Sequence, residues 1–476
     1  MAANSGWQLL TFAARAVAGL GVVVLVARAG GPRSLGVFQF ALTLTAMLPF
    51  YYGVPSLLAR EVARRPAEGR RWVEAGTLIS LIAGGFFTLV FAVGAIVVHA
   101  SHETVVAVQL AGVGMAFDGI ARVQFAAFWA WERLRTEALI TSVQEATFLI
   151  GTAVVLGTGG GVLGAMIAFT GSRALGAGLG WVLVGRRLGA LPVPRAEARF
   201  LRTTVRRCTP FAVSDTLTLT YMRADSVMLG VIHGPVAVGL YQAGTNLVLY
   251  FNVLARSVNH ALYPRMSKAW PGRLGDFRRL RYASFSTIGL IAMPVTVACL
   301  LLAPRTFQFL YGPRFDRAIL TYQLLVLVIP VRMLGHTLSL SLAAADRQTR
   351  RTVAVTAVAV LNVALNLYVI PRWSYLGAAV TTIICETLLF LLYALFLRQV
   401  AGRSDIVRAM VLPGVATVPM AAAILVTNGQ HLLVSVLTGA ATYAVTLVGL
   451  ALARAPRDTG RVRPMQAMMN LVRGTS

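Results

Sequence analysis

Apolar residues run through this chain in long blocks, each bounded by Gly, Pro or Arg. Fourteen such blocks follow one another, and they lack the alternation of apolar and polar residues that a membrane-spanning strand requires. Each block has roughly the 20 residues that a helix needs to cross the hydrocarbon core of a bilayer. The pattern predicts an all-α polytopic membrane protein with about 14 transmembrane helices. The blocks cover residues 7–28, 36–58, 74–98, 104–130, 137–157, 162–185, 208–232, 236–262, 283–304, 318–343, 351–370, 375–397, 408–427 and 431–453.

Composition and charge agree with this interpretation. Hydrophobic residues make up 57% of the 476 positions and charged residues 13%, against about 25% charged residues in soluble proteins. The net charge of +26 would favour nucleic-acid binding in a soluble chain. With the N-terminus placed in the cytoplasm, however, 31 of the 43 Lys and Arg fall in cytoplasmic segments and six in external ones. This bias predicts a multi-pass protein of the bacterial inner (plasma) membrane with both termini cytoplasmic, basic loops facing membrane lipids, and no nucleic-acid partner.

A ten-residue phrase occurs twice, as GPRSLGVFQF at Gly31–Phe40 and as GPVAVGLYQA at Gly234–Ala243, 203 residues later. Two further matches, 213 or 214 residues apart, are Glu132–Arg133 with Asp346–Arg347 and Leu163–Ala165 with Leu376–Ala378. They predict two six-helix parallel repeats plus two C-terminal helices, which is a transporter design. The expected domains are an N-terminal lobe at 1–190, a basic cytoplasmic linker at 191–207, a C-terminal lobe at 208–398, helices 13 and 14 at 399–455, and a basic cytoplasmic tail at 456–476.

Ionisable residues within the predicted helices are the candidate functional residues. A charge at bilayer depth costs about 3 kcal/mol and usually faces a cavity or a partner. The arginines are candidates for binding an anionic substrate, and the acids are candidates for ion pairing or coupling. The arginines are Arg15, Arg122, Arg173, Arg223, Arg256 and Arg332, and the acids are Asp118, Glu145, Asp215, Asp225 and Glu386.

Spacing and depth predict partners for several of these charges. Asp118 and Arg122 are four residues apart on one helix, so they can neutralise each other. Such pairs either belong to a substrate pathway or only fix helix packing. Two ion pairs between helices are also expected, Arg173 with Glu145 and Arg332 with Glu386.

Arg15 is the leading candidate for contacting substrate. It lies near the middle of its helix, and neither that helix nor the next contains an acid at bilayer depth. Asp215 and Arg256 lie nearer the cytoplasmic helix ends, where snorkelling or capping is an equal alternative. The excess of buried arginine predicts a cationic cavity for an anionic substrate. No Walker-type loop, HExxH motif or Cys/His cluster occurs, so no catalytic site, cofactor or metal is expected.

Short motifs near the helix ends resemble those of a known family. They are Leu35–Phe38, Gly53–Val54, Leu58–Glu61, Asp225, Leu229–Gly230, Val238–Tyr241, Tyr263–Ser267, Leu310–Gly312, Ala345–Gln348 and the pair Asn362 and Asn366. On these motifs the chain resembles the Wzx-type polysaccharide flippases of the multidrug/oligosaccharidyl-lipid/polysaccharide (MOP) exporter superfamily, which includes the MATE and MurJ transporters. The resemblance implies alternating access that passes a polyprenyl-diphosphate-linked oligosaccharide to the outer leaflet, and a polysaccharide polymerase or glycosyltransferases as possible partners.

Three other functions remain as alternatives. A MATE-type exporter of organic cations commonly has an Asp in helix 1, where this chain has Arg15. A peptidoglycan lipid II flippase has a Ser-Arg-x-x-Gly motif after helix 1, of which Val26–Gly31 keeps only a fragment. A membrane glycosyltransferase or ligase would need a large external loop or a soluble domain, and the longest external segment here is around Pro304–Arg317. These departures favour the polysaccharide flippase.

Overall fold

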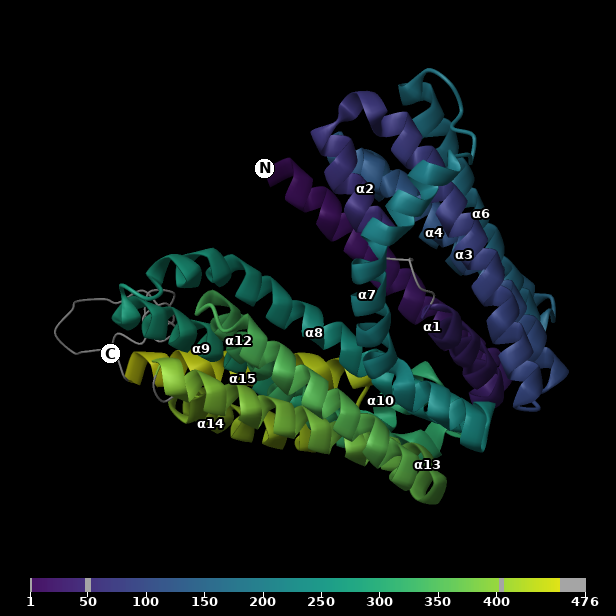
Figure 1. Cartoon of the computed structure of the whole chain (residues 1–476). Coiled ribbons are helices and arrows are strands. Elements are labelled where there is room, and N and C mark those ends of the chain that lie inside the picture. Colours follow the sequence, from purple (N-terminus) through teal and green to yellow (C-terminus); the bar gives the residue numbers. More distant parts are fainter. Residues whose placement is uncertain (1, 48–52, 402–405, 454–476) are drawn as a thin grey trace. The chain divides into compact units, whose positions relative to one another are not determined.

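The computed structural model describes residues 2–47, 53–401 and 406–453, and within these residues the regular structure is helical (Figure 1). The chain divides into two compact units, Met1–Gln242 and Ala243–Ser476. In the described part, ten helices are long and apolar enough to cross a membrane. The two longest of these candidate spans have 40 and 51 residues, which is about the length of two crossings. The all-α membrane fold predicted from the sequence is therefore confirmed.

The first unit is built around a central helix. That helix, α4 (His102–Ala130), packs against α3 (Gly69–Val97) and α6 (Gly161–Leu188), as Figure 1 shows. Helix α5 (Leu134–Gly157) packs against α1 (Ala2–Thr45) and α6. The remaining elements are α2 (Gly53–Arg64), the 3-10 helix η1 (Pro66–Glu68), α7 (Ala198–His233) and the start of α8 (Pro235–Ala269).

The second unit continues α8 and packs its helices in two groups. In one group, α12 (Val328–Ala344) contacts both α9 (Leu274–Leu301) and α13 (Gln348–Ala401). In the other, α14 (Ile406–Val426) packs between α9 and α15 (Leu432–Ala453) around an apolar cluster that includes Met420, Ile424 and Tyr443. Short helices complete the unit: α10 (Ala303–Leu310), η2 (Pro313–Ala318) and α11 (Ile319–Val326).

Two of the long helices each extend over more than one predicted span. Helix α1 covers the first span and the first ten residues of the second, with a non-helical break at Gly31, and α13 covers the eleventh and twelfth spans, with a break at Ser374. Within the second predicted span, α1 ends at Thr45 and α2 begins at Gly53; residues 48–52 of this span lie outside the described residues. The tenth span divides into α11 and α12, next to Pro330, whose nitrogen has no hydrogen to donate to the preceding turn.

The internal repeat is visible in the backbone. Gly31 and Gly234, the first residues of the duplicated phrase, have nearly the same conformation, with φ of 69° and 76° and ψ of −165° and −175°. Glu132 and Asp346 both have left-handed backbones, with φ of 56° and 55°. Gly161 and Ser374 form a third equivalent pair, with φ of 59° and 50°. Each pair has the sequence spacing of the repeat, so the duplication predicted from short motifs is confirmed at three turns.

The predicted domain boundaries are not tested by this fold. Residues 191–197 of the predicted linker are not helical, and α7 already begins at Ala198. Helices 13 and 14 correspond to α14 and α15. The predicted basic tail, 456–476, lies outside the described residues. The limits of the two lobes stay a prediction.

Candidate functional site

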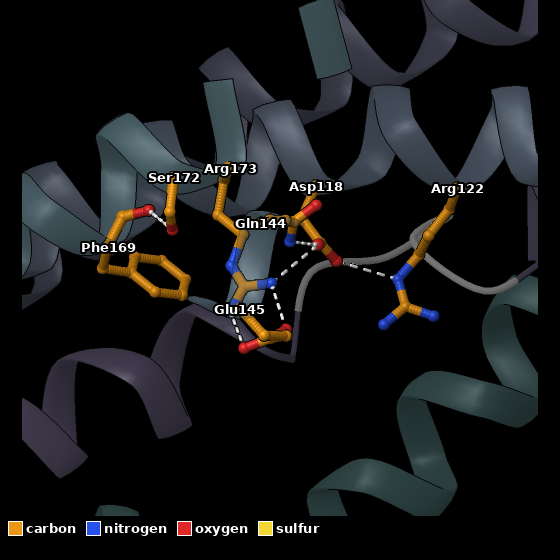
Figure 2. A network of polar contacts seen from close by, with 7 residues as sticks. All are labelled: Asp118, Arg122, Gln144, Glu145, Phe169, Ser172 and Arg173. Atoms are coloured by element: carbon orange, nitrogen blue, oxygen red, sulfur yellow. Dashed lines mark hydrogen bonds and ion pairs between the residues drawn. The ribbon is translucent and has the colours of Figure 1, made fainter. Parts of the chain in front are cut away.

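Four ionisable residues of the first unit meet at the centre of three packed helices (Figure 2). Asp118 and Arg122 lie on α4, Glu145 on α5 and Arg173 on α6. Asp118 precedes the end of α4 at Ala130 by a helical rise of about 18 Å, and Glu145 and Arg173 lie similarly far inside their helices. The cluster therefore lies at mid-helix depth, far from either end.

The contacts form one continuous network. Arg173 donates two parallel hydrogen bonds to Glu145, with Nη1–Oε1 and Nη2–Oε2 distances of 2.7 and 3.3 Å. Its Nη1 also lies 3.7 Å from Oδ1 of Asp118. Arg122 donates from Nε to Oδ2 of Asp118 at 2.9 Å, and Gln144 donates to Oδ1 at 3.4 Å. The predicted Asp118–Arg122 and Arg173–Glu145 pairs are confirmed, and the Asp118–Arg173 contact, which was not predicted, joins them.

The two arginines differ in how far they are enclosed. The side chain of Arg173 is 11% exposed, and its guanidinium carbon lies 5.0 and 5.5 Å from the ring centroids of Phe169 and Phe148. The side chain of Arg122 is 25% exposed. Glu145 and Asp118 are buried, at 6% and 9%. Arg173 is thus fixed on several sides within the helix bundle, whereas Arg122 forms the more accessible edge of the network.

Arg15 is half-buried on α1 and has an acidic neighbour that the sequence did not indicate. Glu137, in the first turn of α5, interacts electrostatically with both Arg15 and Arg122 and accepts a hydrogen bond from Nε1 of Trp129. The sequence did not indicate this acid because Glu137 lies on α5, far in sequence from Arg15 on α1. Arg15 and Glu137, added to the four residues of the network above, make three arginines and three carboxylates, whose formal charges cancel. The expected excess of positive charge is therefore not present among these six side chains.

The second unit holds the other predicted ion pair. Arg332 on α12 donates from Nη2 and Nε to Oε1 of Glu386 on α13, at 2.6 and 2.9 Å. Arg332 is the repeat counterpart of Asp118, 214 residues on, and Glu386 is the counterpart of Arg173, 213 residues on. The same two positions are thus joined in both units, with the charges exchanged.

His336 of the second unit is the repeat counterpart of Arg122. His336 interacts electrostatically with Arg256, Arg332, Arg351 and Glu386, which amounts to three arginines for one acid. Arg256 is exposed on α8. Arg351 was missed by the sequence analysis because it was counted as a residue of a cytoplasmic turn; it lies in the first turn of α13.

Of the two remaining predicted acids, Asp225 is described by the structure and does not join these clusters. Asp225 on α7 accepts hydrogen bonds from the hydroxyl of Tyr241 and from the backbone nitrogen of Ser226, the latter at 2.7 Å, and interacts electrostatically with Arg223. The side chain of Asp215 lies outside the described residues. Within the part of the chain that the structure describes, no group of three or more His, Cys, Asp or Glu is arranged to hold a metal ion.

Comparison with known proteins identifies the family. Residues 1–270 match the family described as polysaccharide biosynthesis protein. The probable flippase AglR of Haloferax volcanii is 25% identical over 174 residues, and the match spans only 36% of that protein's length and 36% of this chain. The chain is also similar in fold to two solved structures. The lipid II flippase MurJ in an inward closed conformation has 15% identity and a TM-score of 0.74, covering 94% of this chain and 99% of that one. An inward-facing multidrug resistance MATE family transporter of the MOP superfamily has 16% identity and a TM-score of 0.66, covering 81% and 94%. This membrane protein therefore belongs to the polysaccharide biosynthesis protein family and has the fold of the MOP superfamily transporters.

Proposed function

We propose that this protein is an alternating-access flippase that moves a polyprenyl-diphosphate-linked oligosaccharide from the cytoplasmic to the outer leaflet of the bacterial inner membrane. Its role would be transport for cell-surface polysaccharide synthesis and not catalysis. Family membership and the transporter fold support the general activity. The observation that carries the proposed substrate is the pair of half-buried arginines, Arg15 and Arg122, which share the neighbour Glu137 in the first unit.

A diphosphate carries its charge through a low-dielectric region, where it needs permanent cationic partners. Guanidinium suits this task because it stays ionised when buried and donates two parallel hydrogen bonds to phosphate oxygens. Arg15 and Arg122 come from different helices, α1 and α4, which pack against each other. They would contact the diphosphate from two directions.

The network around Asp118 provides a way to release Arg122 to a substrate. Asp118 contacts two arginines, Arg122 at 2.9 Å and Arg173 at 3.7 Å. If Arg122 turned towards a phosphate, Asp118 would keep the contact with Arg173 and the hydrogen bond from Gln144. The exchange would therefore avoid leaving a buried carboxylate without a partner, which is the costly outcome. Arg173 would position the network and would not contact substrate.

The ion pairs also bear on the choice among transporters. An exporter of organic cations needs a carboxylate that can face its substrate. Asp118, Glu145 and Glu386 each contact an arginine instead. The lipid II flippases share both the fold and the need to bind a diphosphate, so the sugar portion of the substrate has to distinguish them.

The test is a flipping assay with purified protein in liposomes. A fluorescent polyprenyl-diphosphate oligosaccharide is placed in the membrane, and its transfer is followed with a reagent that modifies only one leaflet. The polyprenyl-diphosphate oligosaccharide should be moved, whereas a lipid II analogue, a polyprenol without phosphate and an organic cation should not. Transport of the lipid II analogue alone, or of the cation alone, would refute the proposed substrate.

Arg122 provides the matched variants for this assay. Losing a charge-assisted hydrogen bond of about 1.5–3 kcal/mol slows transport about tenfold or more, so Arg122→Ala should be nearly inactive. Arg122→Lys keeps the positive charge but loses the two parallel N–H donors of the guanidinium, so partial activity is expected. Arg133→Ala, at an exposed turn just before α5, is the control and should transport normally. Equal rates for Arg122→Ala and Arg133→Ala would exclude Arg122 from the site.

A further inference from the structure

The duplicated phrase makes a contact with its own second copy. Pro32 and Pro235 follow the two equivalent glycines, Gly31 and Gly234, and each proline begins a helical segment. Four residues after each proline comes another glycine, Gly36 or Gly239. All of these residues belong to the same compact unit.

Gly36 and Gly239 approach each other reciprocally. A Cβ atom built on Gly36 would overlap the carbonyl oxygen of Pro235 and lie 3.0 Å from the backbone nitrogen of Gly239. A Cβ atom built on Gly239 would overlap the carbonyl oxygen of Pro32 and lie 3.0 Å from the nitrogen of Gly36. Each segment thus offers the other the same surface, as in an isologous interface. Because the opposing atoms are backbone, no side chain can move aside to admit a methyl group.

The contact continues along the two segments. A Cβ atom on Gly230 of α7 would overlap the ring of Phe40, which lies one turn after Gly36. Gln242 donates to Ser226 at 2.9 Å and lies 3.5 Å from the hydroxyl oxygen of Thr43. Thr43 is 2% exposed and Gln242 is 1% exposed. The surface that begins at the glycines is therefore closed to solvent for about two helical turns.

We infer that this reciprocal glycine contact is the outer closure of the transport path: it holds the duplicated segments together while the path faces the cytoplasm and separates when the path opens outward. The inference rests on the proposed function and topology, which place both phrases at the outer membrane surface. Close backbone contact excludes water without strong bonds, because Cα–H···O contacts are individually weak. Glycine therefore gives a tight closure that can still reopen in each cycle.

The first test introduces the missing methyl group. Gly36→Ala and Gly239→Ala are compared with Gly171→Ala, whose Cβ would meet nothing within 4 Å on α6. Each is placed in a protein whose three cysteines, Cys208, Cys299 and Cys385, have been replaced, and which carries Thr43→Cys as the reporter. The rate at which a membrane-impermeant maleimide labels this cysteine from outside is measured without substrate.

The closure predicts faster labelling in Gly36→Ala and Gly239→Ala. A minor conformation is typically populated at about 0.1–10%, so making the open state dominant should raise the labelling rate about tenfold or more. Gly171→Ala should label like its parent. Equal labelling of Gly36→Ala, Gly239→Ala and Gly171→Ala in folded proteins would overturn the inference.

A second test does not depend on how the alanine variants fold. Thr43→Cys and Gln242→Cys are combined and joined by a short, reducible bifunctional thiol reagent. The linked protein should lose transport, and cleavage of the linker should restore it; unchanged transport with the linker intact would overturn the closure. The labelling experiment needs no substrate. If Gly36→Ala and Gly239→Ala label faster than Gly171→Ala but the parent protein does not transport the sugar lipid, the proposed function is refuted and the closure still stands.

Discussion

Replacing Arg173 with Met tests whether the charge network holds the helices of the first unit together. The guanidinium makes two hydrogen bonds of 2.7 and 3.3 Å to Glu145, which is 6% exposed. Met fills similar space but leaves this carboxylate without its cation. Breaking a buried ion pair by removing one partner typically costs about 3–5 kcal/mol of stability. Asp118 keeps Arg122, so the loss should come mainly from Glu145.

The assay is thermal unfolding of the purified protein in detergent, with Arg187→Met as the control because Arg187 is exposed in the last turn of the same helix. Arg173→Met should unfold at a clearly lower temperature than Arg187→Met. The double variant Arg173→Met/Glu145→Leu should recover most of the loss, because a well-packed apolar pair is often as stable as the buried ion pair that it replaces. A fully stable Arg173→Met, or a double variant no better than the single one, would refute the packing role.

Three further predictions follow from the charges and the topology. Arg15→Ala should slow transport about tenfold or more at unchanged thermal stability, with partial rescue by Lys, and normal transport by a stable Arg15→Ala protein would exclude it from substrate binding. The exchanged double variant Arg332→Glu/Glu386→Arg should unfold close to the parent temperature, whereas each single change leaves two like charges facing each other and should lose about 3–5 kcal/mol; a double variant as unstable as the singles would contradict this. Labelling of tags from outside the cell should succeed at two sites and fail at two others, which tests the topology: Ser101 and Gly429 should be labelled, and Gly272 and Ser404 should not.

The sequence was sufficient to predict the helices and most of the ion pairs between them. Apolar blocks of helical length mark the spans directly, and three turns of the repeat could be located from short matches. Arg173–Glu145 and Arg332–Glu386 could be predicted because few acids lie at bilayer depth, so each buried arginine has few possible partners. The break inside the tenth span was missed because hydropathy alone does not show where a helix is interrupted.

Contacts that depend on helix rotation could not be predicted. Asp118 was assigned to Arg122 by its spacing, but only the packing of α4 against α6 brings Arg173 within 3.7 Å of it. Glu137 lies in a first helical turn, where the helix dipole favours negative charge, so its place in the sequence does not point to Arg15. The duplicated phrase predicted the repeat, but nothing in one sequence indicates that its second glycine meets its own copy.

The exchanged ion pair helps to separate structural charges from functional ones. The two units place an acid and an arginine at the same repeat positions with opposite polarity, Asp118 with Arg173 and Glu386 with Arg332. A substrate phosphate would not bind equally well to an acid and to an arginine at equivalent positions. An ion pair that links two helices, in contrast, has the same net charge whichever helix carries the acid. The asymmetric position is therefore more informative. Arg122 corresponds to His336, so only the first unit has a permanent cation there. On this reasoning, the charge of the substrate should be recognised by residues whose repeat counterpart does not carry the opposite charge. Arg122 should therefore matter for transport, and Arg173 for stability.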